Sequence, residues 1–167
     1  MATLTARFFD YETLKTKLAP GSKVVVVSCD CCARLSDGLG GQVGLDRLAD
    51  KLEADGFEVV RRELLPEACS AEELAERLED KATAGAFAEA DVVIPLACCA
   101  GIDLAGKEFG EDRLLVVTCT LGQGPCSPES GPRLTEPREG IEIQIDDPDG
   151  IPLADAAQRL GLFPGSF

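Results

Sequence analysis

The sequence contains no histidine and no tryptophan, and it has only one tyrosine among its 167 residues. The missing histidine excludes mixed Cys/His zinc sites, Rieske centres, His-ligated haem and nucleophiles activated by histidine. The shortage of large aromatic rings disfavours a flavodoxin-like flavin carrier, because few side chains could stack on an isoalloxazine. Any chemistry of this chain must therefore use other side chains.

Long apolar segments are also missing. No stretch is long and apolar enough to span a membrane, and residues 1–7 have neither the basic start nor the apolar run of a signal peptide. The net charge of -14 argues against nucleic acid or an anionic membrane as a partner, because phosphates are bound mainly by clustered Lys and Arg. We therefore expect a soluble cytoplasmic protein, and its length suits one domain, residues 1–167.

Cysteine, in contrast, is abundant, with eight thiols in the chain. A reducing cytoplasm makes a disulfide framework an unsuitable explanation, which leaves metal binding or thiol chemistry. A single cysteine such as Cys31 or Cys119 would usually be a small buried hydrophobe. Three thiols within Cys29-Asp30-Cys31-Cys32, directly after a run of four valines, are hard to explain by packing alone.

Apolar runs alternate with helical patterns along the chain. The continuous run Lys23–Ser28 is typical of a parallel strand that is covered on both faces. Further strands are predicted at residues 57–64, 91–97 and 113–118, with a short edge strand at 141–145, and helices at residues 10–20, 45–56, 70–82 and 152–161, with one or two helical turns within 101–110. This alternation predicts an α/β domain with a mainly parallel, doubly wound sheet of about four strands.

Two segments flank this predicted pattern. Residues 1–22 are expected to form a helical extension, in which Asp10 caps the helix. Residues 122–140 contain four prolines and four glycines, which predicts a long extended loop. The glycines at 38–44 do not match the G-x-G-x-x-G spacing, so a nucleotide site is disfavoured.

The cysteines fall at or after the carboxyl ends of the predicted strands. They are Cys29, Cys31 and Cys32 after the first strand, Cys69 after the second, Cys98 and Cys99 after the third, and Cys119 and Cys126 after the fourth. In open α/β sheets, ligands bind beyond these ends. We therefore expect the cysteine-rich loops to meet around a metal centre, and thiolate-only ligands point to zinc or to an iron–sulfur cluster.

Four short motifs follow one another along the chain. They are Ser28-Cys29-Asp30-Cys31-Cys32, Gly40-Gly41 before a helix, Pro66-Glu67-Ala68-Cys69, and Leu96-Ala97-Cys98-Cys99-Ala100-Gly101. Their order resembles that in the C-terminal domain family of methylenetetrahydrofolate reductases, whose free-standing form is called MetV. The resemblance covers roughly residues 20 to 125 and places the family's cysteines on Cys29, Cys32, Cys69 and Cys98. This sequence departs from the family pattern in its cysteines at 31 and 99 and in lacking a glycine directly after Cys98.

The resemblance implies an iron–sulfur subunit with one [4Fe–4S] cluster in one-carbon metabolism. Such a subunit is itself non-catalytic and relays electrons to or from the flavin of a MetF-type methylenetetrahydrofolate reductase, with further electron-donor subunits as additional partners. Cys31, Cys99, Cys119 and Cys126 form the candidate ligand set for a second cluster.

Two alternatives remain at this stage. One is a zinc-binding module that stabilises or regulates the same complex, because four thiolates also suit zinc. The other is a thiol–disulfide oxidoreductase that uses Cys29 and Cys32 as a C-x-x-C dithiol, which leaves six cysteines without a role.

Overall fold

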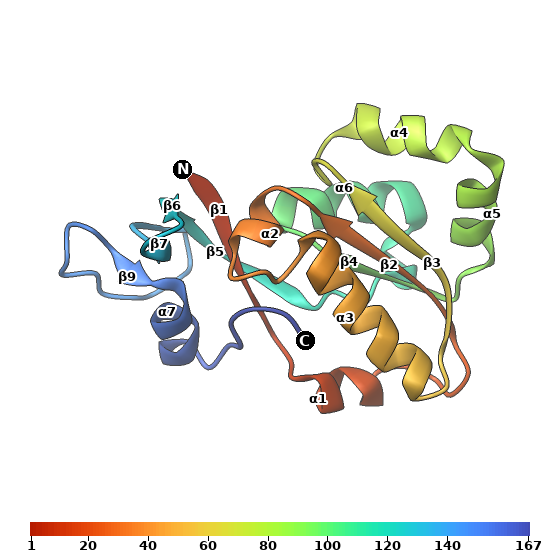
Figure 1. The fold of residues 1–167 in the computed structure, drawn as a ribbon, viewed down its shortest axis with the longest axis horizontal. Coiled ribbons are helices and arrows are strands. Elements are labelled where there is room, and N and C mark those ends of the chain that lie inside the picture. The colour runs from red at the N-terminus through yellow and green to blue at the C-terminus, as the bar shows by residue number, and fades with distance from the viewer.

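Three parallel strands form the centre of the fold in the computed structural model, which describes all residues 1–167 (Figure 1). Strand β2 (Lys23–Cys29) lies between β3 (Glu58–Leu65) and β4 (Val92–Leu96). The four valines of β2 are all buried, as expected for a strand covered on both faces. The prediction of this strand is confirmed, and β3 and β4 match the next two predicted strands closely.

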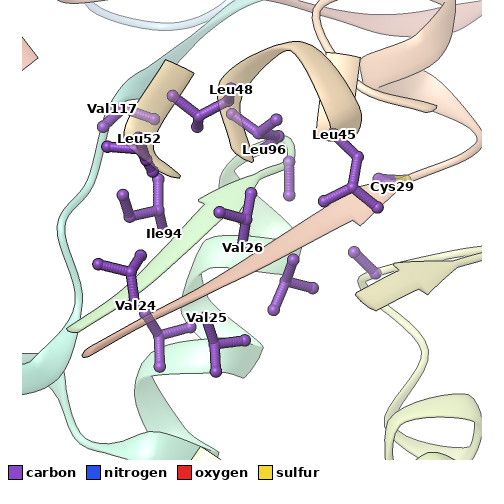
Figure 2. Close-up of a cluster of buried hydrophobic side chains, with 14 of the residues drawn as sticks. Val24, Val25, Val26, Cys29, Leu45, Leu48, Leu52, Ile94, Leu96 and Val117 are labelled. Carbon is purple, nitrogen blue, oxygen red and sulfur yellow. The ribbon is translucent and has the colours of Figure 1, made fainter. Parts of the chain in front are cut away.

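Helix α3 (Gly41–Ala54) covers one face of these strands. Its residues Leu45, Leu48 and Leu52 point toward the sheet and meet side chains such as Val26 and Ile94 (Figure 2). Helix α6 (Cys99–Phe109) lies behind the sheet in Figure 1, while α4 (Ala71–Glu79) and α5 (Lys81–Glu89) connect β3 to β4. No helix is long and apolar enough to cross a membrane.

A second, antiparallel sheet makes the predicted doubly wound parallel architecture wrong. Strand β1 (Ala2–Arg7) pairs with β5 (Thr118–Gly124), which also pairs with β8 (Glu136–Pro137). A third small sheet contains β6 (Cys126–Ser127), β7 (Gly131–Leu134) and β9 (Ile151–Pro152). The chain therefore mixes helices with parallel and antiparallel strands, and a second buried cluster that includes Leu4, Leu121 and Leu153 lies under the antiparallel part.

The predicted fourth parallel strand is correct for only one residue pair. Leu114 forms an isolated parallel bridge with Val93, after the short 3₁₀ helix η1 (Glu111–Arg113). The regular strand β5 then begins at Thr118 and runs antiparallel to β1. The first 22 residues, expected to be helical, therefore contribute a strand before α1 (Tyr11–Thr16) begins. The predicted cap of α1 is confirmed, because the Asp10 carboxylate accepts a hydrogen bond of 2.8 Å from the Thr13 N–H.

Residues 122–140 were expected to form a loop, but they contain the end of β5 and the strands β6, β7 and β8. Gly124, at the end of β5, allows β7 to pass close by, since a Cβ at position 124 would lie 1.7 Å from the Arg133 carbonyl oxygen. The predicted edge strand at 141–145 does not form, although Ile141, Ile143 and Ile145 pack partly buried on the second cluster. The apolar alternation at these positions therefore reflects burial of one side of the segment, which pairs with no other strand.

The helix predicted at 70–82 is divided at Asp80. This residue ends α4 and caps α5, because its carboxylate accepts a 2.8 Å hydrogen bond from the Thr83 N–H. The final helix is confirmed as α7 (Leu153–Arg159), directly after Pro152. Helix α6 is longer than the one or two turns predicted, with 11 residues.

Candidate metal centre

The carboxyl ends of β2, β3 and β4 meet at one edge of the parallel sheet. Cys29, the last residue of β2, is in register with Leu65 at the end of β3, and Ser28 is in register with Leu96 at the end of β4. The Asp30 N–H continues this edge by donating to the Leu65 carbonyl at 2.8 Å. The loops that carry Cys32, Cys69 and Cys98 therefore start side by side, as the sequence predicted.

The first cysteine loop is folded tightly over the end of β2. Cys31 is the N-cap residue of the four-residue helix α2 (Cys32–Leu35). Gly40 then passes so close that a Cβ there would lie 2.6 Å from the Ala33 Cβ and 2.9 Å from the Cys29 carbonyl oxygen. A side chain at position 40 would force this turn away, so glycine is needed to keep the loop compact.

The loops of Cys69 and Cys98 are brought together by a second close approach. Cys98 is the N-cap residue of α6, and Gly101 lies in the first turn of that helix. A Cβ on Gly101 would meet the Ala97 Cβ at 2.8 Å and the Ala68 Cβ at 3.2 Å. The first turn of α6 thus packs directly against the residue that precedes Cys69.

Neighbouring thiols affect the pKa values of the cysteines at this edge. Burial raises the pKa of the Cys69 thiol, and the nearby Cys98 and Cys29 raise it further. Burial also raises the pKa of Cys98, and Cys32 contributes in the same direction. These effects connect Cys69 with Cys98 and Cys29, and Cys98 with Cys32 and Cys99, so they join cysteines of both candidate sets.

The environment of Cys98 also contains groups that favour a negatively charged sulfur. Its Sγ makes no regular capping hydrogen bond, yet the backbone N–H groups of Gly101 and Ala100 lower the pKa of the thiol against the larger effect of burial. These N–H groups belong to the positive end of the α6 dipole. The side chain of Cys98 is 6% exposed, whereas Cys69 is exposed at the surface.

The second candidate set does not gather in the same way. The pKa of Cys31 is raised to about 11 by burial and then by its neighbours Cys32 and Cys29, which belong to the first set. Burial raises the pKa of Cys126, and Cys32 adds to this effect. Burial likewise raises the pKa of Cys119, with an opposing effect from Arg138 and a further increase from Cys99. Within the second set, these effects link only Cys99 and Cys119.

The thiols are not arranged as a ready coordination sphere. All eight cysteines are free, and no group of three or more Cys, Asp or Glu side chains could hold a metal ion as the side chains stand. The backbone brings the loops to one edge, and metal binding would require the thiol side chains to reorient there. The donor chemistry of Cys29, Cys32, Cys69 and Cys98, four soft thiolates without nitrogen ligands, fits zinc or an iron–sulfur cluster.

Two threonines that sequence reasoning missed attach the antiparallel sheet to this edge. Thr118 donates its hydroxyl to the Ala97 carbonyl at 2.7 Å, and the Cys99 N–H donates to the Thr120 hydroxyl at 2.8 Å. The signal in the sequence is the alternation Thr118-Cys119-Thr120, which is typical of a strand with one polar face. The hydrogen-bond partners of this polar face, at Ala97 and Cys99, could be recognised only once the position of β5 was known.

A cavity of about 470 Å³ opens beside the N-terminal end of α6. Its lining includes Cys99, Cys119 and Arg138 together with the apolar side chains of Phe8, Ile102 and Leu114. Cys99 and Cys119, both of the second candidate set, therefore line the same open cavity.

Comparisons of the chain with protein-family models, with curated proteins and with solved structures found no match.

Proposed function

We propose that Cys29, Cys32, Cys69 and Cys98 hold one iron–sulfur cluster and that the chain is an electron-transfer subunit. The partner in this proposal is a MetF-type, flavin-containing methylenetetrahydrofolate reductase. The observation that carries the metal part is the meeting, at three adjacent strand ends, of the loops that hold these four cysteines. The identity of the partner rests on the sequence resemblance alone.

The surroundings of these thiols are compatible with thiolate ligands of a bound metal. Burial and then the neighbouring Cys98 and Cys29 raise the pKa of the Cys69 thiol, and a bound metal cation would favour its thiolate form. The N–H groups of Gly101 and Ala100 favour negative charge at Cys98. When bound, an iron–sulfur cluster supplies one-electron transfer at a potential set by nearby hydrogen bonds and solvent exposure.

Burial of Cys29 argues against the thiol–disulfide alternative. A dithiol enzyme attacks its substrate with an accessible thiolate, and Cys29 is only 3% exposed. The zinc alternative uses the same four thiols, so only the metal content separates it from the iron–sulfur proposal.

The partner proposal is tested by native isolation and by routed electron transfer. Isolation from the source organism should recover the chain with a flavoprotein. In the reconstituted complex, Cys98→Ser should stop flavin reduction through this chain, because serine replaces a soft thiolate by a mostly protonated hydroxyl. An artificial donor should still reduce the partner's flavin, and this serves as the control. Recovery of a lone protein, or unimpaired routed transfer by Cys98→Ser, contradicts the proposal.

A further inference from the structure

Thr5 carries a buried hydroxyl that has no hydrogen-bond partner. The residue is 0% exposed, and its Oγ1 is the only buried side-chain nitrogen or oxygen atom in the structure left unpaired. Burying a hydroxyl without a partner costs free energy. Valine has nearly the same shape and suits a strand at least as well, so the retention of the hydroxyl calls for an explanation.

The strand register places Thr5 on the same face of the β1–β5 pair as Thr120. Thr5 is directly opposite Thr120 in the antiparallel pair of β1 and β5, and opposite residues project from the same face. On that face, the Thr120 hydroxyl accepts a hydrogen bond from the Cys99 N–H at 2.8 Å. Thr5 therefore lies on the side of the pair that meets the first turn of α6.

A second contact ties Thr5 to the other cysteine loop. The Thr5 N–H donates to the Ser36 hydroxyl at 3.0 Å, and that hydroxyl donates to the Cys32 carbonyl at 2.9 Å. Thr5 is thus tied through Ser36 to the helix that begins at Cys32, and its cross-strand partner Thr120 is tied to the helix that begins at Cys99. The register of β1 is irregular between Leu4 and Thr5, and such irregularities commonly redirect a side chain beside a functional site.

We infer that Thr5 is a positioning residue whose hydroxyl donates a hydrogen bond to a sulfur atom of the centre, on the side of Cys32 and Cys98. This inference rests on the proposed function and names a residue outside the cysteine loops. A donor aimed at sulfur stabilises the more reduced form of a cluster and therefore raises its reduction potential. The unpaired hydroxyl of Thr5 is then a cost of the metal-free protein that metal binding removes.

The test compares Thr5→Val and Thr5→Ser in metal-free and iron-loaded protein. Thr5→Val should raise the thermal midpoint of the metal-free form, because it removes an unpaired buried hydroxyl. The same change should lower the midpoint of the iron-loaded form and shift the reduction potential to a more negative value. Thr5→Ser keeps the hydroxyl and should keep the wild-type potential.

Thr83 provides the matched control for the opposite shifts of the thermal midpoint expected in the metal-free and iron-loaded forms. It is also buried, but its hydroxyl is paired with the Asp80 carboxylate at 2.8 Å, in α5. Thr83→Val should therefore lower the midpoint of both forms and leave the potential unchanged.

The outcomes separate the inference from the proposed function. Wild-type protein that takes up iron, together with a Thr5→Val potential equal to that of wild type, overturns the inference alone. The potential decides the matter even if the metal-free variants do not fold. Wild-type protein that takes up no iron under anaerobic reconstitution overturns the proposed function and the inference with it.

Discussion

Gly101 packs against Ala68 so closely that a Cβ at position 101 would lie 3.2 Å from the Ala68 Cβ. This contact joins the first turn of α6 to the loop that ends at Cys69, and it fixes how near two of the four candidate ligands can come. The same added Cβ would lie 2.8 Å from the Ala97 Cβ, closer than such atoms normally approach. The contact makes position 101 a sensitive test of whether the two loops must be close together.

Gly101→Ala should destabilise the protein and reduce metal uptake. The overpacking cost of about 1–3 kcal/mol exceeds the gain of about 1 kcal/mol from the better helix propensity of alanine. Chemical denaturation and metal content measure the two effects. Gly85→Ala is the control, because Gly85 lies within α5 with no atom within 4 Å of the added Cβ. It should stabilise the protein by about 0.5–1 kcal/mol, and equal effects of both substitutions would argue against the close packing.

The two cysteine sets should differ in their effect on iron content. Replacing Cys69 by serine should abolish cluster binding, because Cys69 is linked to Cys98 and Cys29 at the common edge. Replacing Cys119 should leave the iron content unchanged, since it lies in β5 of the antiparallel sheet, outside the three strand ends that carry the first set. Colorimetric iron determination on anaerobically reconstituted protein makes the comparison. Loss of half the iron in Cys119→Ser would instead support a second cluster.

Leu48→Ala should destabilise the main core by about 2–5 kcal/mol, the usual cost of removing a fully buried leucine side chain. Leu48 is 0% exposed and lies on the face of α3 that points toward the sheet (Figure 2). Val43→Ala, in the same helix, is the matched control, because Val43 is 61% exposed. Its effect on the free energy of unfolding should stay within about 0.5 kcal/mol. A loss below about 1 kcal/mol for Leu48→Ala would contradict the described packing.

Acid should weaken the protein partly through the cap of α5. Hydrogen bonds from the Thr83 backbone N–H and hydroxyl lower the pKa of Asp80 below its usual value of 3.8. A lowered folded-state pKa means that Asp80 contributes its stabilisation above the unfolded-state pKa and loses it as the pH falls through the folded-state pKa. Asp80→Asn keeps an acceptor but cannot titrate, so its free energy of unfolding should fall less steeply below about pH 4. Identical pH profiles for the two proteins would show that Asp80 is not coupled to folding.

The parallel core and the meeting of the cysteine loops could be predicted from local patterns. Four consecutive buried valines identify a central strand, and the register of Cys29 with Leu65 follows once three parallel strands lie together. The carboxyl ends of parallel strands share one edge, so residues that follow each strand meet there whatever their separation in sequence. The meeting of the strand ends that precede Cys32, Cys69 and Cys98 needed no further information.

The antiparallel part could not be predicted because its pairings join distant segments. Strand β1 pairs with β5 across more than 100 residues, and neither segment has a turn that would announce a hairpin. Leu114 forms a bridge with Val93 of β4, but the chain then leaves the parallel sheet and pairs with β1. One apolar run therefore contributes residues to two different sheets. Thr5 was missed for the same reason, since its relation to Cys99 exists only through Thr120.

Metal analysis of anaerobically purified protein tests the central claim most directly. A single [4Fe–4S] cluster should give a brown protein with about four iron atoms per chain that bleaches on reduction with dithionite. Cys98→Ser, prepared in parallel, should be colourless and free of iron. A colourless wild-type protein with one zinc per chain would contradict the electron-transfer function, and a wild-type protein without any metal would contradict the thiolate centre itself.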